Sequence, residues 1–379
     1  MHVATHSSIE AIAAAEWNAL TPSGNPFLQH AFLRALETGD SVGKDSGWQV
    51  ALLTLSDAQG LAAAAPAYIK QHSYGEFVFD FSWAQAYSRY GLDYYPKLVV
   101  AAPFTPASGP RLLVRADLDA AATRAALVGA LQEFAHAQSL SSIHALFADA
   151  ESRAAFAGAG WLARNTCQFH WNNHDYRDFD HYLESFTADK RKKAKRERRR
   201  VLESGITFRT RHGDEMTAAE LDAAFELHRG TFLRHGHEPY LTHATFRQIA
   251  AALGRSFMIK FALEHSRPVA VAIFFISRNT LYGRYWGSRD AYHSLHFETC
   301  YHQGIDYCIE KQLQHFEPGT QGEHKVSRGF EPALTHSAHY IADARFRAPI
   351  ADFVKRERDS IADYAAEIQT HVPYRDRRA

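Results

Sequence analysis

Hydrophobic residues in the first seventy positions change from a helical to an alternating pattern. Apolar side chains recur at helical spacing in Ala11–Leu20 and Pro26–Leu36, and Asn25 stands where a helix cap is expected, just before a proline at the first helical position. The alternation in Trp48–Leu55 predicts a strand, and Leu61–Ile69 is its expected hairpin partner. Two helices followed by a hairpin indicate a domain that mixes helices and strands.

Helix and strand patterns continue to alternate up to a boundary near Asn165. A chain of 379 residues is long enough for two domains of about 150–200 residues. We therefore expect one domain over 1–165 and a second over 166–379. The elements predicted around the boundary are a helix at Leu118–His136, a strand at Ile143–Phe147, a helix at Ala150–Ala159 and a strand at Cys167–Trp171.

The second half is predicted to hold a basic helix, a strand meander and a C-terminal helix. The basic helix is expected over 179–203. Three strand-like runs joined by short turns follow, and short turns favour antiparallel neighbours. The runs are Phe257–Glu264, Val269–Ser277 and Leu281–Trp286, and a helix at Leu295–Leu313 and a strand at Ser337–Ala342 come after them.

Composition and charge favour a folded protein with local charge features. Apolar residues make up 46% of the chain and charged residues 22%, which is typical of a globular protein. The 42 Lys and Arg residues balance 42 Asp and Glu residues, so no overall field attracts nucleic acid or membrane. Met1–Leu20 lacks the pattern of a signal peptide, and no later run has the length of a spanning helix, so we expect a soluble, cytoplasmic protein without membrane insertion.

Cysteine and histidine spacing does not predict a metal centre. Cys167, Cys300 and Cys308 are too few and too irregularly spaced for a disulfide framework or a structural zinc site. The 23 histidines include close pairs, but none has the two-His-plus-Glu helical spacing of a zinc hydrolase. We therefore expect no metal ligands.

A dense positive run marks the predicted basic helix. Lys190–Arg200 contains nine basic residues in eleven positions. An apolar stripe by which the helix can dock is supplied by Leu183, Phe186, Ala194 and Val201. Phosphate is the natural partner of such a run, either in RNA such as tRNA or in a nucleotide donor. A solvated helix whose charges are balanced by acids elsewhere is an equally good interpretation.

Aromatic and charged residues are interleaved between Tyr68 and Arg111. Asp80, Trp83 and Lys97 belong to this run, and the mixture of charges and rings is typical of a binding wall. Rings that fill a core beneath a long loop would explain the aromatic residues equally well.

The stretch Gly319–Pro332 has the composition of a functional loop. It combines three glycines, which let backbone approach a ligand, with His324, Lys325 and Arg328, which can take up or stabilise charge. A solvated glycine-rich turn is the alternative.

Several sequence blocks resemble the FemAB-like family of predicted N-acyltransferases, which are also described as peptidoglycan biosynthesis or recognition proteins. The blocks extend over nearly the whole chain, and together they are more specific than any one alone. In the second half they are Tyr282–Gly287, His296–Tyr301, Gln321–Lys325 and Arg328–Phe330, and in the first half Gly75–Asp80, Trp83–Ala84, Tyr95–Leu98 and Pro103–Pro106.

The resemblance implies an α/β (α+β) protein with two tandem GNAT-like domains, each a mixed, mostly antiparallel sheet flanked by helices. It also implies transfer of an acyl or aminoacyl group to a small-molecule or peptide amine, as in Fem-type transferases that move an amino acid from aminoacyl-tRNA to a peptidoglycan precursor. Acyl-coenzyme A is the other candidate co-substrate. The chain lacks the Arg/Gln-x-x-Gly-x-Gly/Ala stretch that holds the pyrophosphate of coenzyme A in ordinary GNAT enzymes.

Acyl transfer needs a deprotonated amine, a group that polarises the donor carbonyl, and a proton source for the leaving group. Glu298 is the candidate base, although stabilisation of a helix start explains a carboxylate there equally well. His324 is the candidate proton source or an orienting donor, and Tyr285 is a candidate donor to the carbonyl or leaving group. The candidate substrate-binding residues are Lys325, Arg328, Trp286, His296, Arg284, Glu323, Asp80, Trp83 and Lys97.

Two other hypotheses remain. Cys300 lies four residues after His296, which permits a thiolate and a covalent acyl-enzyme, but GNAT-type transfer is direct and a helical cysteine is usually a small buried hydrophobe. The second hypothesis is a non-catalytic protein of the same fold that binds a cell-wall precursor or RNA.

Overall fold

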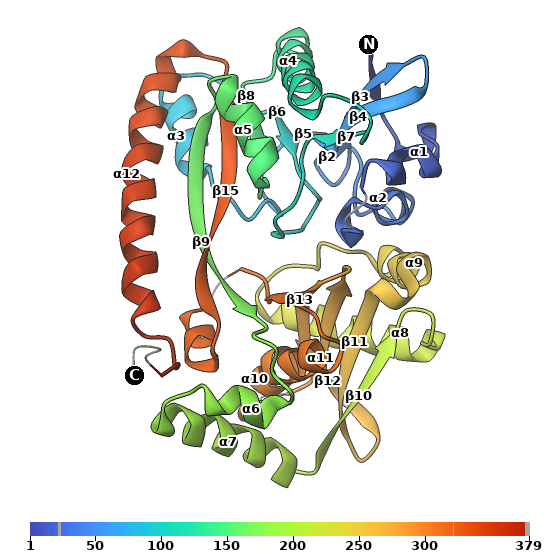
Figure 1. Cartoon of the computed structure of the whole chain (residues 1–379). Helices are drawn as coiled ribbons and strands as arrows, with labels where there is room; N and C mark the ends of the chain where they lie inside the picture. The colour runs from blue at the N-terminus through green and yellow to red at the C-terminus, as the bar shows by residue number, and fades with distance from the viewer. Residues whose placement is uncertain (22–23, 291, 321, 376–379) are drawn as a thin grey trace. The chain divides into compact units, whose positions relative to one another are not determined.

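The computed structural model describes residues 1–21, 24–290, 292–320 and 322–375, so Gln321 of the loop motif lies outside it. The chain forms two compact units (Figure 1). The first unit comprises Met1–Cys167 and Leu334–Asp363, and the second comprises Gln168–Ala333 and Tyr364–Ala379.

The later part of the chain is divided differently from the sequence-based prediction. That prediction placed all of 166–379 in the second domain, whereas Leu334–Asp363 belongs to the first unit. The reason is strand pairing, because β15 (Glu331–Ile341) pairs antiparallel with β8 (Ser142–Ala145). Helix α12 (Ala344–Gln369) then begins in the first unit and ends in the second.

The first unit contains a mixed sheet with strand order β15-β8-β6-β5-β2. Its β6 (Lys97–Val100) pairs parallel with β8 and antiparallel with β5 (Ala67–Lys70), and β5 pairs antiparallel with β2 (Trp48–Val50). Strand β3 (Leu52–Asp57) instead pairs with β4 (Gly60–Ala65) in a second sheet, so the predicted hairpin is shared between two sheets.

Helices of the first unit cover an apolar core between these sheets. The second sheet has the order β1-β3-β4-β7, with β1 at His2–His6 and β7 at Leu113–Val114. The long helix α4 (Ala120–Ala137) packs on both sheets through residues such as Leu127 and Leu131. The other helices are α1 (Ala14–Ala19), α2 (His30–Thr38), α3 (Phe81–Arg89) and α5 (Ala150–Gly158).

The second unit is built on the predicted meander. Strands β11 (Phe257–Glu264), β12 (Arg267–Ile276) and β13 (Thr280–Ser288) are antiparallel neighbours, which confirms that prediction. Strand β10 (Ile206–His212) extends this sheet at the β11 edge. At the other edge β13 pairs parallel with β14 (His315–Glu317), which pairs antiparallel with the end of β9 (Leu162–Asn172).

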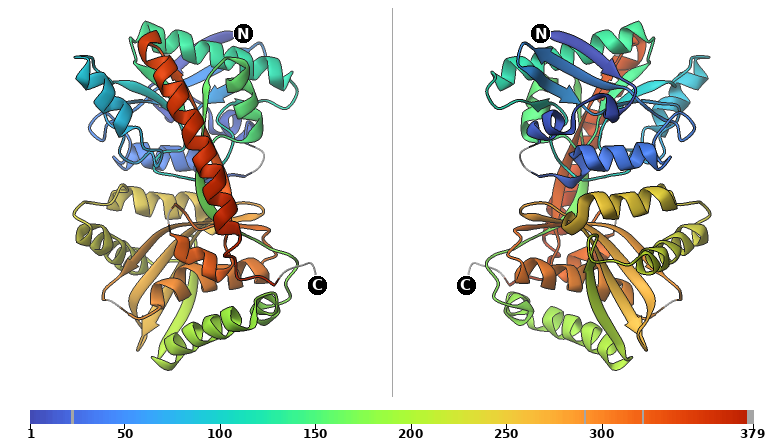
Figure 2. Two further views of the ribbon diagram at one scale, coloured as in Figure 1. Left: turned by 90° about the vertical axis from the view of Figure 1, so that its left-hand side faces the viewer. Right: turned by 90° about the vertical axis from the view of Figure 1, so that its right-hand side faces the viewer.

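Helices cover both faces of the second sheet (Figure 2). Helices α8 (Ala218–Arg234) and α9 (His243–Leu253) lie on one face, where Phe246 contacts the Phe257 ring. The opposite face carries the apolar cluster that includes Met258, Phe274 and Ile305. It is covered by α6 (Phe179–Glu184), α7 (Ala188–Glu203), α10 (Leu295–Phe297) and α11 (Gln303–Glu310).

Two predicted helices are interrupted. The basic helix predicted over 179–203 is two helices, because the chain turns at 185–187 to bury Phe186 and to let the Thr187 N–H donate to the Pro373 carbonyl. The helix predicted over Leu295–Leu313 contains a π-helical turn at Glu298–His302. Such turns are frequent at functional sites.

The predicted fold class is confirmed. Both units contain mixed, mostly antiparallel sheets flanked by helices, and each includes a parallel pair of strands, β6–β8 in the first and β13–β14 in the second. Among the described residues, none of the helices combines the length and apolar character that a transmembrane span requires.

Candidate active site in the second unit

A cavity of about 230 Å³ opens where the parallel strands β13 and β14 separate. Their pairing ends at Tyr282 and Glu317, and the residues that follow this pairing, Gly283–Trp286 in β13 and Pro318 after β14, line the cavity. Ligand sites form preferentially beyond the carboxyl ends of parallel strands. The described lining residues are Ala272, Ile273, Phe274, Gly283, Arg284, Tyr285, Trp286, His296, Cys300, Tyr301, Pro318, Thr320, His324 and Lys325.

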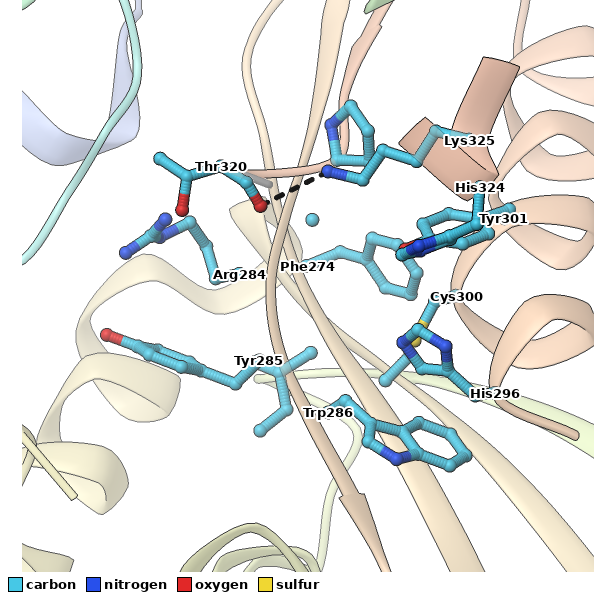
Figure 3. Close-up of a pocket in the computed structure, with 14 residues that line it drawn as sticks. Phe274, Arg284, Tyr285, Trp286, His296, Cys300, Tyr301, Thr320, His324 and Lys325 are labelled. Carbon is cyan, nitrogen blue, oxygen red and sulfur yellow. Dashed lines mark hydrogen bonds between the residues drawn. The ribbon is translucent and has the colours of Figure 1, made fainter. Parts of the chain in front are cut away.

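A bulge in β13 shapes one wall of the cavity. Ile273 pairs with Tyr285, but the next residue, Phe274, pairs with Gly283, so Arg284 is the extra residue. Bulges redirect side chains and occur often beside active sites. Arg284 and Tyr285 lie on one side of the cavity in Figure 3, and burial is the main reason that the pKa of the Tyr285 hydroxyl is raised.

Glycine permits close packing behind this wall. A Cβ atom at Gly287 would lie 2.4 Å from the His228 nitrogen and 2.5 Å from the Leu227 carbonyl carbon of helix α8. The second glycine of the Tyr282–Gly287 block therefore lets α8 pack directly against β13, which fixes the strand that carries Arg284 and Tyr285.

The opposite wall comes from α10 and the π-helical turn. The His296 ring lies edge-on to Trp286 at 5.2 Å and to Tyr301 at 5.4 Å between ring centres. Burial, followed by the neighbouring charges of His324, Lys325 and Arg328, lowers the pKa of His296 to about 4. His296 is therefore neutral at physiological pH and contributes a polar ring without a charge.

Lys325 is the buried cation of this cavity. Its Nζ donates to the Gly319 carbonyl at 2.7 Å and to the Thr320 carbonyl at 3.3 Å, the second bond being drawn in Figure 3. Only 1% of the residue is exposed, and no carboxylate of the described chain forms an ion pair with it. Burial lowers the pKa of the Lys325 amine to about 7, so its neutral form is populated near physiological pH.

The glycine of the loop makes this arrangement possible. Gly319 has a φ of 89°, a conformation that costs glycine little and other residues much more. This backbone conformation presents the Gly319 carbonyl to Lys325. The loop thus holds the amine by neutral backbone groups instead of by an acid.

His324 and Tyr301 form a second polar pair. The Tyr301 hydroxyl lies 2.9 Å from His324 Nε2. Burial raises the pKa of Tyr301 and, together with the charges of Lys325 and Arg328, lowers that of His324. A protonated tyrosine and a neutral imidazole allow Tyr301 to donate to Nε2, in which case the His324 Nδ1 carries the hydrogen.

The Cys300 thiol also lines the cavity, but its environment opposes a thiolate. Burial raises the pKa of Cys300, and the nearby Lys325 opposes that shift only in part. A reactive cysteine needs a lowered pKa. Cys300 is thus suited to packing, and its environment weighs against the covalent acyl-enzyme hypothesis.

Glu298, the candidate base, lies outside the lining set. Its Oε1 accepts from Gln303 Nε2 at 2.8 Å and lies 3.2 Å from an Arg198 nitrogen, while Oε2 lies 3.0 Å from His302 Nδ1. Burial alone would raise the pKa of Glu298, but His302 and Arg198 bring it below its ordinary value. Through these contacts Glu298 links the π-helical turn to α7, which is a structural role.

Arg328 and Glu323 also bind other parts of the protein. Arg328 Nη2 pairs with Glu197 of α7 at 2.9 Å, and its guanidinium lies 3.5 Å from the centre of the Phe297 ring. Glu323 accepts a hydrogen bond of 2.8 Å from the Tyr364 hydroxyl. Both residues hold the short 3₁₀-helix Glu323–Arg328, which carries His324 and Lys325, and neither is among the described lining residues.

The three candidates from the first half meet in the first unit. Lys97 Nζ lies 2.5 Å from Asp80 Oδ2 and 2.8 Å from Glu76 Oε2, all three being buried. Trp83 packs beside this cluster, with its ring 5.0 Å from that of His339. The fold thus joins Asp80, Trp83 and Lys97 to one another, and not to the cavity of the second unit.

The geometry gathers six of the candidate residues around one cavity, namely Arg284, Tyr285, Trp286, His296, His324 and Lys325. It adds Tyr301 and Thr320, to which the sequence assigned no role. Tyr301 could have been found from its helical spacing to Phe297, whose ring it contacts. Thr320 could not, because it contributes its backbone carbonyl, a group that every residue has. Within the described residues, no group of three or more His, Cys, Asp or Glu side chains is placed to hold a metal ion.

The fold and this cavity define a protein of two mixed α/β units with a candidate site at the parallel strand pair of the second. The family model described as FemAB-like, peptidoglycan biosynthesis/recognition, matches residues 8–376. The chain therefore belongs to the FemAB-like family, which confirms the resemblance in its sequence blocks. No curated protein matches the chain in sequence.

Solved structures share this fold at low sequence identity. The crystal structure of FemX is 12% identical, with a TM-score of 0.56, and the match covers 93% of this chain and 100% of FemX. The C-terminal domain of a putative lysylphosphatidylglycerol synthetase from Agrobacterium fabrum is 10% identical with a TM-score of 0.56, covering 92% of this chain and 97% of that one. L-PGS from Bacillus licheniformis is 11% identical with a TM-score of 0.52, covering 86% and 95%.

Proposed function

We propose that this FemAB-like protein transfers an acyl or aminoacyl group to an amine acceptor in the cavity between β13 and β14. The observation that carries the proposal is Lys325, a buried amine that lines the cavity and is held by two backbone carbonyls. A lysine with a pKa near neutrality is suited to proton transfer at physiological pH.

Hydrogen-bond counting defines what Lys325 can do. A neutral amine has two hydrogens and one lone pair, and the Gly319 and Thr320 carbonyls accept both hydrogens. The lone pair is then available to accept a proton. A protonated amine has a third hydrogen, which it can return to a leaving group. The same nitrogen thus serves both proton steps of an acyl transfer.

In the proposed reaction the acceptor nitrogen attacks the donor carbonyl carbon, and a C–N bond forms. Lys325 takes the proton that the attacking amine loses. The bond from the carbonyl carbon to the leaving oxygen or sulfur then breaks, and Lys325 returns the proton to that atom. Tyr285 and Arg284, on the opposite side of the cavity, supply donors for the oxyanion.

We propose an aminoacyl ester of tRNA as the donor in preference to acyl-coenzyme A. Exposed cations on α7 support this choice. Within the described residues of α7, Lys195 pairs with Asp180, and Arg198 with Glu298 and Asp306, whereas the other exposed cations of this helix form no ion pair. These cations, which we call the α7 basic surface, are Lys190, Lys192, Lys193, Arg196, Arg199 and Arg200.

The helix start beside the cavity also disfavours coenzyme A. In the described part of the chain, α10 has only three residues and its first cap, Ser294, makes no side-chain hydrogen bond to the helix. The chain also lacks the glycine-rich cradle that places a pyrophosphate at a helix start. The family description makes the amine of a peptidoglycan precursor the proposed acceptor.

A transfer assay with labelled donors tests the proposal. Purified protein is incubated with a mixture of charged tRNAs, or with acyl-coenzyme A esters, and with amine-bearing peptidoglycan precursors, and product is measured by mass spectrometry. We expect product with charged tRNA in the wild type, none with Lys325→Met, and wild-type amounts with Lys355→Met, which changes an exposed lysine of α12.

Each other outcome has a defined meaning. Product from acyl-coenzyme A alone would replace the proposed donor. Full activity of a folded Lys325→Met variant would contradict the role of this lysine. Binding of a precursor or tRNA without product from any donor would favour the non-catalytic binding protein.

A further inference from the structure

The first unit contains a separate cavity of about 330 Å³ between α5 and the strands β9 and β15. Helix α5 contributes one face, because its four lining positions are spaced by three, one and three residues. Ala163 and Asn165 of β9 alternate along their strand, as do His336 and Ala338 of β15, and Ser337 between the latter two also lines the cavity. The lining residues are Ala150, Arg153, Ala154, Ala157, Trp161, Ala163, Asn165, His336, Ser337 and Ala338.

Small side chains create this hollow. Three of the four α5 residues that face it are alanines, and both strands add another alanine, Ala163 and Ala338. Larger side chains at these positions would fill the space between helix and sheet. The resulting volume lies at the lower end of the range of about 300–1,000 Å³ that is typical of small-molecule sites.

Arg153 is the one charged side chain among the described lining residues. Its Nε is buried and has no hydrogen-bond partner, and none of the described carboxylates forms an ion pair with Arg153. Glu151, two residues before Arg153 on α5, pairs instead with Arg124 of α4, so the acid that is near in sequence is used elsewhere. A buried N–H without an acceptor is costly, and an oxygen of a bound anion would supply that acceptor for Nε.

Trp161, which lines the same cavity, carries a second unused donor. Trp161 is 5% exposed, and its indole Nε1 is buried without a hydrogen-bond partner. Buried indole N–H groups usually find a partner. Two unpartnered donors at one cavity therefore point to a ligand that carries acceptor atoms.

Neutral polar groups complete the lining. The His336 Nδ1 lies 2.9 Å from Asn165 Oδ1, which fixes the hydrogen on Nδ1 because a carbonyl oxygen only accepts. Burial, followed by the charge of Arg153, lowers the pKa of His336. The imidazole is therefore neutral and leaves Arg153 as the positive group of the site.

We propose that this cavity binds a small organic monocarboxylate, with the carboxylate on Arg153 and an apolar body against Trp161 and the alanines. A guanidinium matches a carboxylate in shape and charge and can donate two parallel hydrogen bonds to it. The site lies within the first unit and does not depend on the proposed transferase reaction.

Ligand-observed NMR of the full-length protein tests the proposal. The probes are benzoate and valerate, with benzamide and valeramide as uncharged counterparts of the same shape. We expect saturation transfer to the carboxylates with affinity on the order of millimolar, as for ligands of this size. We expect the amides to bind at least about tenfold more weakly, because they cannot form charge-assisted hydrogen bonds.

Two variants locate the binding. Arg153→Gln keeps a polar side chain but removes the charge, and Ala157→Leu fills the cavity from α5 without changing Arg153. Each is expected to weaken carboxylate binding at least about tenfold. Arg89→Gln, which changes an exposed arginine of α3, is the matched control and is expected to bind like the wild type.

The opposite results would overturn the proposal. These results are no carboxylate binding to the wild type, equal binding of acids and amides, or unchanged binding in a folded Arg153→Gln or Ala157→Leu variant. The circular dichroism spectrum of each variant establishes that it is folded.

Discussion

The Lys325 Nζ donates a hydrogen bond of 2.7 Å to the Gly319 carbonyl, six residues earlier in the same loop. A lysine that is paired with a carboxylate stays charged up to high pH, whereas one held by carbonyls in a buried site loses its proton more easily. This single contact therefore connects the conformation of the loop to the protonation state of the Lys325 amine.

The pH dependence of transfer follows from the pKa of Lys325, which burial lowers to about 7. Only the neutral amine accepts a proton, so kcat/KM is expected to rise with pH and to level off above about pH 7. Lys325→Arg, which stays protonated, is expected to lower kcat/KM by on the order of 10²–10⁴-fold. Steady-state kinetics from pH 5.5 to about 9 measure this. A wild-type profile without an acidic limb would contradict the role of Lys325.

The same group links stability to pH. Its folded pKa of about 7 lies below the ordinary value of 10.5, so between these values the unfolded chain binds more protons than the folded one. The unfolding free energy therefore rises with pH across this window, by up to about 1.4 kcal/mol per unit, and the full penalty for the buried charge is present below pH 7. Lys325→Met is expected to lack this contribution. Denaturant unfolding of both proteins at several pH values measures the difference, and parallel pH curves would refute it.

Removal of Lys97 is expected to destabilise the first unit strongly. Lys97 lies between Glu76 and Asp80, and burial raises the pKa of Glu76 to about 7 even though Lys97 opposes that shift. Without the ammonium group, two carboxylates remain buried, at a cost of about 3–5 kcal/mol. Urea unfolding of Lys97→Met measures this cost. Lys44→Met, at an exposed position of the same unit, is the control, and equal losses in the two variants would argue against the buried pair.

Replacement of Glu298 separates stability from catalysis. Glu298→Gln removes the carboxylate beside Arg198, although Asp306 stays paired with that arginine at 2.6 Å. We expect a loss of about 1–3 kcal/mol in the unfolding free energy and an unchanged pH profile of kcat/KM. Glu310→Gln, at an exposed position of α11, is the control. Loss of turnover at full stability would restore Glu298 as the base.

RNA binding by the α7 basic surface is expected to depend steeply on salt. Neutralisation of Lys192, Lys193, Arg196 and Arg199 to glutamine is expected to lower the slope of log K against log salt by about 1 for each phosphate that the protein no longer neutralises. The matched control neutralises Lys44, Arg89, Lys355 and Arg356, which are also exposed. Fluorescence anisotropy with labelled tRNA measures both. Equal slopes in the two variants would exclude α7 as the RNA surface.

Sequence patterns predicted the second unit better than the first. The meander was predicted because short turns force neighbouring strands to pair, whereas β15 joins the first unit through a pairing with β8 that lies about two hundred residues earlier. The break between α6 and α7 depends on the burial of Phe186 and on a contact with Pro373, neither of which is visible in a charge pattern.

The candidate site shows the same limit. Lys325 and His324 were predicted because an ionisable, glycine-rich loop is unusual, and the structure places both at the cavity. Asp80 and Lys97 were predicted as binding residues because buried charges are rare. In the structure they form a buried ion pair with each other, although they lie seventeen positions apart in the sequence. The bulge at Arg284 depends on the register between two strands, which one strand alone does not reveal.

Three changes of unit, after Cys167, Ala333 and Asp363, have a consequence for synthesis on the ribosome. Strand β8 pairs with β6 on one side and with β15 on the other, so its second edge has no partner until residue 341 has been made. His144 on that edge likewise waits for His339, whose Nδ1 lies 2.6 Å from its own in the finished protein. The first unit to emerge from the ribosome is thus completed only after residues 168–333 of the second unit have been made. Until then it has an open strand edge that chaperones or the nascent chain itself must cover.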